Sequence, residues 1–128
     1  MKKRKSQWWR GRAIDIWSIP HFVFGVVVSM FALLFGVPFT ETLLITLVLA
    51  IFWEYFEMRL RLREERLNVL ADVLLPLFAC LVTFLLLGNE AISFEQRIGL
   101  LTVSVLFYIM VTVVAWRARL NHERGFMR

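Results

Sequence analysis

The 128-residue sequence contains a single cysteine, Cys80, which excludes an intramolecular disulfide framework and a cysteine-rich zinc module. It has no Gly-rich phosphate loop and no G-x-S-x-G nucleophile motif, so two common enzyme signatures are missing. Charged residues make up only 20% of the chain and fall in short blocks between long apolar runs. With a hydrophobic content of 59%, this distribution excludes a disordered chain, a nucleic-acid-binding arm and an ordinary soluble domain.

Four apolar runs are long enough to cross a bilayer, which takes about 20 helical residues. They cover residues 13–36, 40–58, 68–87 and 98–116. The first run is too long for a cleaved signal peptide, and no small-residue cleavage site follows it, so we expect it to be retained. In lipid only helices and closed barrels satisfy their backbone hydrogen bonds. We therefore predict an all-α integral membrane protein, a four-helix transmembrane bundle forming one domain over residues 1–128.

Positive charges flank these runs unequally. Fourteen of the fifteen Lys and Arg residues lie on one side of the predicted membrane, and only Arg97 lies on the other. By the positive-inside rule, both termini are expected in the cytoplasm of a multi-pass protein of the cell (inner) membrane. All five tryptophans fall near the same cytoplasmic interface. The net charge of +5 then indicates attraction to anionic lipids of the inner leaflet, not to nucleic acid.

Ionisable residues inside a membrane span are costly, so each marks a candidate functional site. The polar set within the runs is Asp15, His21, Glu54, Glu57 and Asp72, with Asn68 as a neighbour. At 1.5 Å per residue, the acids and the histidine lie within about 13 Å of the nearest flanking arginine, in the cytoplasmic half of the bilayer. Glu54 and Glu57 share a helix face, as do Asn68 and Asp72. We expect His21 to converge with these four residues on one site that opens toward the inner leaflet.

The residue types in this set leave several chemistries open. Imidazole and carboxylate ligands at one depth suit a divalent cation bound by His21, Glu54, Glu57 and Asp72. The same groups suit proton transfer, with His21, Glu54 and Asp72 as the catalytic residues. Internal pairing is the alternative, in which His21 hydrogen-bonds a carboxylate and Glu57 pairs with Arg61. Arg61 is also a candidate for holding a headgroup phosphate.

Two prolines bear on the local structure around the polar set. Pro76 has no N–H to donate to the carbonyl of Asp72, which leaves a backbone oxygen beside that carboxylate. Pro20 either interrupts the first helix or lies in the first turn of a helix capped by Ser18. In the second case, the segment before the helix lies along the membrane surface as a basic, Trp-rich stretch. Asp15 is close enough to water that we expect it to cap a helix.

Three motifs carry a resemblance to a known family. They are DIWSIPHFVFG in the first run, WEYFE in the second and NVLAD in the third, which contain Asp15, His21, Glu54, Glu57, Asn68 and Asp72. The arrangement resembles the VanZ-like family of small bacterial membrane proteins and covers roughly residues 15–87. The resemblance implies a cell-envelope role, linked in family members to glycopeptide tolerance, without implying an established reaction.

Three functions are compatible with these features. The first is an envelope-associated protein that binds or modifies a lipid headgroup or a lipid-linked precursor, with a divalent cation as a candidate cofactor. The second is proton- or ion-coupled transport by a homo-oligomer, with Glu54 as the titrating group. The third is a non-catalytic membrane scaffold. The polar side chains in the outer halves of the first three runs are the hydroxyls of Ser29, Thr42, Thr46 and Thr83, which disfavours transport.

The charge asymmetry makes the orientation testable. Single cysteines placed by Val37→Cys and Asn89→Cys should react with a membrane-impermeant thiol reagent added to intact cells. Cysteines placed by Ser6→Cys and Asn121→Cys should react only after the cells are opened. Labelling of either of the latter two positions from outside would contradict the cytoplasmic placement of both termini.

Overall fold

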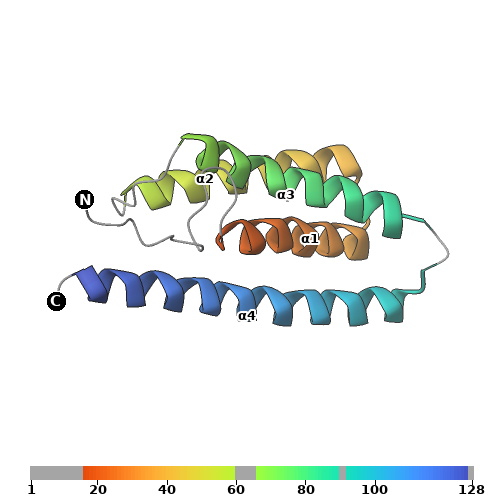
Figure 1. Ribbon diagram of the computed structural model, residues 1–128. Helices are drawn as coiled ribbons and strands as arrows, with labels where there is room; N and C mark the ends of the chain where they lie inside the picture. The colour runs from red at the N-terminus through yellow and green to blue at the C-terminus, as the bar shows by residue number, and fades with distance from the viewer. Residues whose placement is uncertain (1–15, 60–65, 90–91, 127–128) are drawn as a thin grey trace.

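A computed structural model describes residues 16–59, 66–89 and 92–126, with side chains up to residue 120. Over these residues the chain forms four helices, α1 (Ser18–Phe35), α2 (Phe39–Arg59), α3 (Arg66–Leu87) and α4 (Phe94–Phe126). The helices alternate in direction, so α1 begins and α4 ends at the same end of the bundle (Figure 1). All four are long and apolar enough to span a membrane. The predicted all-α, four-helix membrane architecture is confirmed.

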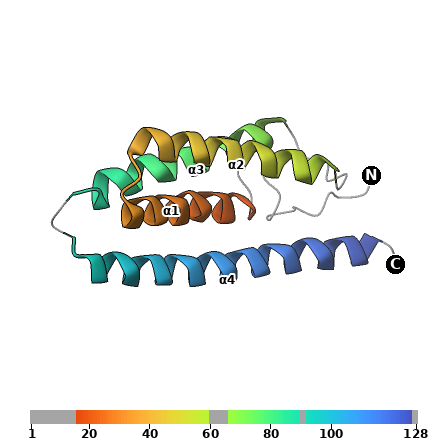
Figure 2. The same cartoon turned by 180° about the vertical axis from the view of Figure 1, so that it is seen from behind.

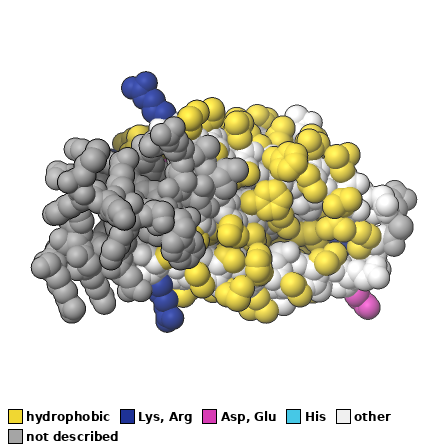
Figure 3. All heavy atoms as spheres, in the orientation of Figure 1, with side chains coloured by type: hydrophobic (Ala, Val, Ile, Leu, Met, Phe, Trp, Pro, Cys, Tyr) yellow, Lys and Arg dark blue, Asp and Glu magenta, His cyan; other side chains and the backbone are white. Residues whose placement is uncertain are grey.

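The helices turn polar faces inward and apolar faces outward. In α2 the buried residues are Thr42, Thr46, Ala50, Glu54 and Glu57, all on one face. The outward side of the same helix carries large apolar residues such as Val48 and Phe52, which are 64% and 68% exposed. Hydrophobic side chains also cover much of the described surface in view (Figure 3). An apolar exterior over a polar interior suits hydrocarbon as the solvent, which identifies the chain as a multi-pass membrane protein.

Helix α1 is the centre of the bundle. It packs against α2, α3 and α4, and nine of its 18 residues are buried. Helix α3 also packs against α2, whereas α4 makes close backbone contact with α1 alone among the described helices. Both views show α4 running beside α1, apart from the α2–α3 pair (Figure 1, Figure 2). Among the described residues, α2 and α4 therefore make no close backbone contact with each other.

Small residues bring α1 and α3 into close contact. A Cβ atom built on Gly25 would lie 2.6 Å from the Cα atom of Pro76, well inside van der Waals distance. One turn later, the Ser29 hydroxyl donates to the Gly25 carbonyl at 2.7 Å, so its oxygen is turned back onto its own helix. On α3, Ala79 and Cys80 are fully buried. Small residues that let backbones approach are a common basis of helix packing in membranes.

The two ends of the bundle differ in polarity. Met30, Leu33 and Leu101 form an apolar cluster at the end where α1 finishes. There the Arg97 guanidinium donates to the Leu33 carbonyl at 3.0 Å and to the Asn89 carbonyl at 3.3 Å. The one arginine of the predicted outer side thus caps the last turn of α1, where carbonyls lack helical partners. The buried ionisable residues lie at the other end.

Two helix boundaries differ from the sequence prediction. Helix α1 begins at Ser18, with Trp17 in the N-cap position and no side-chain cap bond, so Ser18 is not the cap that one of the two alternatives for Pro20 included. Pro20 lies in the first turn, where a missing N–H costs no helical hydrogen bond. The expected cap at Asp15 lies outside the described residues. Helix α4 continues to Phe126, and its 33 residues span about 50 Å, longer than the hydrocarbon core of about 30 Å.

The close approach at Gly25 generates a stability prediction. Gly25→Ala should destabilise the protein by about 1–3 kcal/mol, because the added methyl group collides with the α3 backbone and forces the helices apart. Gly99→Ala on α4 is the matched control, since a Cβ there meets no atom within 4 Å and alanine favours helix by up to about 1 kcal/mol. The measurement is unfolding in mixed micelles. Equal stability of the two variants would contradict the packing described here.

Candidate functional site

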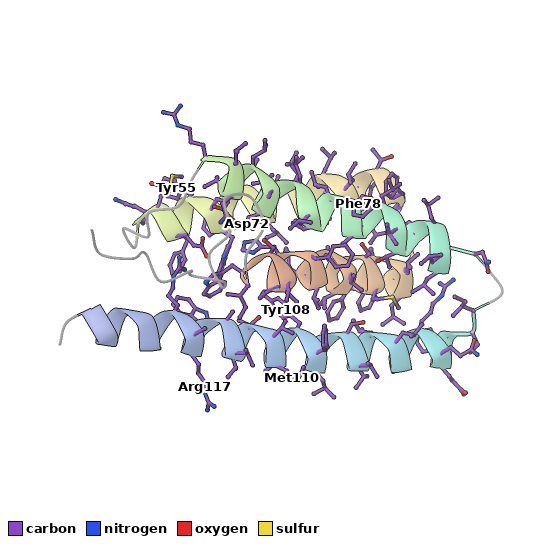
Figure 4. All side chains as sticks on the ribbon, in the orientation of Figure 1. Tyr55, Asp72, Phe78, Tyr108, Met110 and Arg117 are labelled. Atoms are coloured by element: carbon purple, nitrogen blue, oxygen red, sulfur yellow. The ribbon has the colours of Figure 1, made fainter. Side chains whose placement is uncertain are left out.

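Three buried ionisable side chains come from three different helices at one end of the bundle. His21 lies three residues into α1, Glu54 lies five residues before the end of α2, and Asp72 lies six residues into α3. At 1.5 Å per residue these positions are roughly 5–9 Å from the helix ends. The residues are 7%, 4% and 0% exposed. Figure 4 labels Asp72 at this end of α3.

The three side chains are close enough to act together. His21 Nε2 lies 3.4 Å from Glu54 Oε1, and His21 Nδ1 lies 3.8 Å from Asp72 Oδ1. One potential ligand atom from each residue lies within 4.8 Å of the other two. The structure therefore brings together three of the residues that the sequence placed on inward faces at a common depth.

A backbone hydrogen bond determines how His21 presents its ring. Nδ1 lies 2.7 Å from the Trp17 carbonyl oxygen, which also accepts the His21 backbone N–H at 3.3 Å. Because a carbonyl oxygen only accepts, Nδ1 must carry the proton of this bond. In the neutral ring, the lone pair is then on Nε2, which faces Glu54. Beyond each other, neither Nε2 nor Glu54 Oε1 has a hydrogen-bond partner among the residues described.

Asp72 is oriented by its own helix. The Asn68 amide, one turn earlier, donates to Asp72 Oδ2 at 3.2 Å, while Oδ1 is the oxygen near His21. One turn later, Pro76 contacts Gly25, which itself lies one turn after His21. The tight Gly25–Pro76 contact therefore sets the separation of the two helices next to the site. The predicted face shared by Asn68 and Asp72 is buried, at 2% and 0% exposure.

Glu57 does not join the group of three. It is buried, at 3% exposure, on the same face of α2 as Glu54. Its Oε1 accepts a hydrogen bond of 2.9 Å from the indole N–H of Trp53. Glu57 therefore lies beside the group of His21, Glu54 and Asp72 but is not a member of it. The remaining candidates, Asp15 and Arg61, lie outside the described residues.

A mostly apolar cavity of about 260 Å³ adjoins His21. Leu49, Phe52 and Trp53 of α2 line one side, Tyr108 and Thr112 of α4 line the other, and His21 lies in the wall formed by α1. The cavity is partly open, consistent with the absence of close backbone contact between α2 and α4. Figure 4 labels Tyr108 midway along α4. Sequence reasoning did not predict this cavity, because its lining residues share no motif.

Aromatic contacts join the start of α1 to α4 next to the cavity. The rings of Trp17 and Trp116 meet edge to face, with centroids 5.1 Å apart. The Arg119 guanidinium lies over the Trp17 ring, 4.9 Å from its centroid. Trp17 also lines the cavity and is only 2% exposed. These contacts tie the beginning of α1 to the later part of α4 and hold in place the carbonyl that orients His21.

No family model, curated protein or solved structure matches the chain. The resemblance to the VanZ-like family therefore stays a prediction. The residues of the site and the cavity beside it are the features that bear on its function.

The contact between His21 and Glu54 generates a coupling prediction. In a double-mutant cycle of His21→Gln and Glu54→Gln, the stability effects should deviate from additivity by about 0.5–3 kcal/mol, because the side chains are 3.4 Å apart. The control pairs His21→Gln with Thr83→Val, near the opposite end of α3. The effects of those two substitutions on the free energy of unfolding should be additive to within about 0.5 kcal/mol. Unfolding in mixed micelles gives all the values, and additive effects of His21→Gln and Glu54→Gln would contradict a direct interaction.

Proposed function

We propose that this protein binds an amphipathic lipid of the membrane, with a hydrocarbon chain in the cavity between α2 and α4 and the polar group near His21. The supporting observation is the cavity itself, an apolar space that has a buried imidazole in its wall. Its volume of about 260 Å³ is close to the lower end of the roughly 300–1,000 Å³ typical of small-molecule sites. This volume is enough for part of one hydrocarbon chain of a lipid.

The route into the cavity is sideways, from the hydrocarbon. Phe52 lines the cavity and is also 68% exposed on the outer surface of α2. On the opposite side, α4 buries little of its surface, and side chains such as Met110 face outward. A lipid chain moving between these helices stays in apolar surroundings throughout, so entry has no desolvation cost for the chain.

The polar end of the ligand then lies at the end of the bundle that carries most of the positive charge. Arg59 ends α2 and Arg66 begins α3 at the end where Glu54 and Asp72 lie. Basic residues beside a membrane attract anionic headgroups by about 1 kcal/mol each. These features favour a negatively charged lipid or lipid-linked precursor of the cell envelope as the ligand, with the polar group near the inner leaflet.

The two other candidate functions have less support. The hydroxyls toward the opposite end of the bundle each donate to the backbone carbonyl four residues back, so none of them donates to another helix as a transport path would need. They belong to Ser29, Thr42, Thr46 and Thr83.

A non-catalytic scaffold would be expected to satisfy its buried polar atoms. His21 Nε2 and Glu54 Oε1 face each other at 3.4 Å and have no further hydrogen-bond partner within the described chain, which is compatible with a ligand-binding role.

Filling the cavity should reduce lipid binding. Leu49→Trp adds an indole to the cavity wall, so it should weaken binding of a lipid with a fluorescent chain by about tenfold, or about 1.4 kcal/mol. Leu44→Trp is the matched control, since Leu44 is on the same helix, 57% exposed and outside the cavity. The measurement is a titration in nanodiscs containing a metal chelator. Equal affinity of both variants and the unaltered protein would contradict binding in this cavity.

A further inference from the structure

We infer that His21, Glu54 and Asp72 together bind one divalent transition-metal ion of the Zn²⁺ or Mn²⁺ class, with an open coordination position toward the cavity. The inference does not rest on lipid binding, because it concerns the three side chains alone. It follows from their donor atoms, their spacing and the hydrogen bonds that orient them.

The donor set is one imidazole nitrogen and two carboxylate groups. Imidazole binds Zn²⁺, Fe²⁺ and related ions well, whereas Mg²⁺ and Ca²⁺ prefer oxygen ligands only. The three residues are 7%, 4% and 0% exposed, so few water molecules compete for their lone pairs. A bound cation would hold both His21 Nε2 and Glu54 Oε1, which face each other at 3.4 Å and have no further hydrogen-bond partner among the described residues.

The spacing of the ligand atoms fits a small ion. A tetrahedral ion with metal–ligand bonds of about 2.0–2.1 Å holds neighbouring ligand atoms about 3.4 Å apart. His21 Nε2 and Glu54 Oε1 are separated by 3.4 Å. All three ligand atoms lie within 4.8 Å of one another. Asp72 Oδ1 lies 3.8 Å from Nδ1, so coordination beside Nε2 requires rotation of the Asp72 side chain.

Neighbouring groups orient the ligands as they do in known metal sites. A metal-binding histidine usually donates its other ring N–H to a carbonyl or carboxylate, which fixes the tautomer. Here Nδ1 donates to the Trp17 carbonyl at 2.7 Å, which directs the Nε2 lone pair toward Glu54. The ligating carboxylate is in turn held by a hydrogen bond, since Asn68 donates to Asp72 Oδ2 at 3.2 Å and leaves Oδ1 toward His21.

Three protein ligands leave a further position for another molecule. Structural zinc sites usually have four protein ligands, whereas three ligands with an open position are typical of sites that bind substrate or water. Of the three ligand residues, His21 alone lines the cavity, which puts the open position beside the cavity wall. An anionic oxygen of a ligand in the cavity is the chemical group that such a position accepts.

Metal titration of the purified protein tests the inference. The protein is stripped with a chelator, kept in detergent without added lipid, and titrated with Zn²⁺, Mn²⁺ and Mg²⁺ in a calorimeter. We expect one Zn²⁺ or Mn²⁺ per chain and much weaker Mg²⁺ binding. His21→Gln and Glu54→Gln should each weaken Zn²⁺ binding by about 100-fold or more, and Asn68→Ala by about 10- to 100-fold.

Glu57→Gln is the matched control, because Glu57 is a buried carboxylate on the same face of α2 but outside the group of three. It should lose much less Zn²⁺ affinity than Glu54→Gln, because Glu57 supplies no ligand atom. Thermal unfolding of each metal-free variant confirms that it is folded before titration. No saturable Zn²⁺ or Mn²⁺ binding to the folded unaltered protein would overturn the inference, as would equal losses in Glu57→Gln and Glu54→Gln. Lipid binding is measured with a chelator present and metal binding without lipid. A failure of the metal-binding inference can therefore be told apart from a failure of the lipid-binding proposal.

Discussion

The contact between Gly25 and Pro76 is the constraint on which the rest of the site depends. With no Cβ on Gly25, the backbones of α1 and α3 approach so closely that a methyl group would collide with Pro76. His21 is one turn before Gly25, and Asp72 is one turn before Pro76, so this contact also brings the imidazole and the carboxylate together. Glu54 then completes the group from α2, which packs against both helices.

Burying these groups is costly, and the fold confines them to one end. Elsewhere in the described interior, hydroxyls donate to their own helix backbone, as Ser29 and Thr83 do, and so require no partner from another helix. The opposite end is instead closed by Met30 and its apolar neighbours, with Arg97 capping the last turn of α1. This division gathers His21, Glu54 and Asp72 at one end of the bundle, beside the cavity.

The position of α4 makes that access possible. Because α4 makes close backbone contact with α1 alone among the described helices, side chains of α2 and α4 line a common cavity. The edge-to-face contact of Trp17 with Trp116 joins the two helices at the polar end. The same Trp17 residue orients His21 through its carbonyl oxygen, so the packing of α4 and the geometry of the imidazole are linked.

Hydrophobic run length alone predicted the four helices, since backbone hydrogen bonds in lipid must be satisfied within each segment. The i, i+4 spacing of Asn68 and Asp72 likewise predicted a shared buried face. Spacing along a helix does not reveal which helices touch, so Glu57 was expected in the group but bonds Trp53 instead. The cavity was not predicted. It lies where α2 and α4 make no close backbone contact, and a sequence pattern shows which helix faces can pack but not which helices pack together.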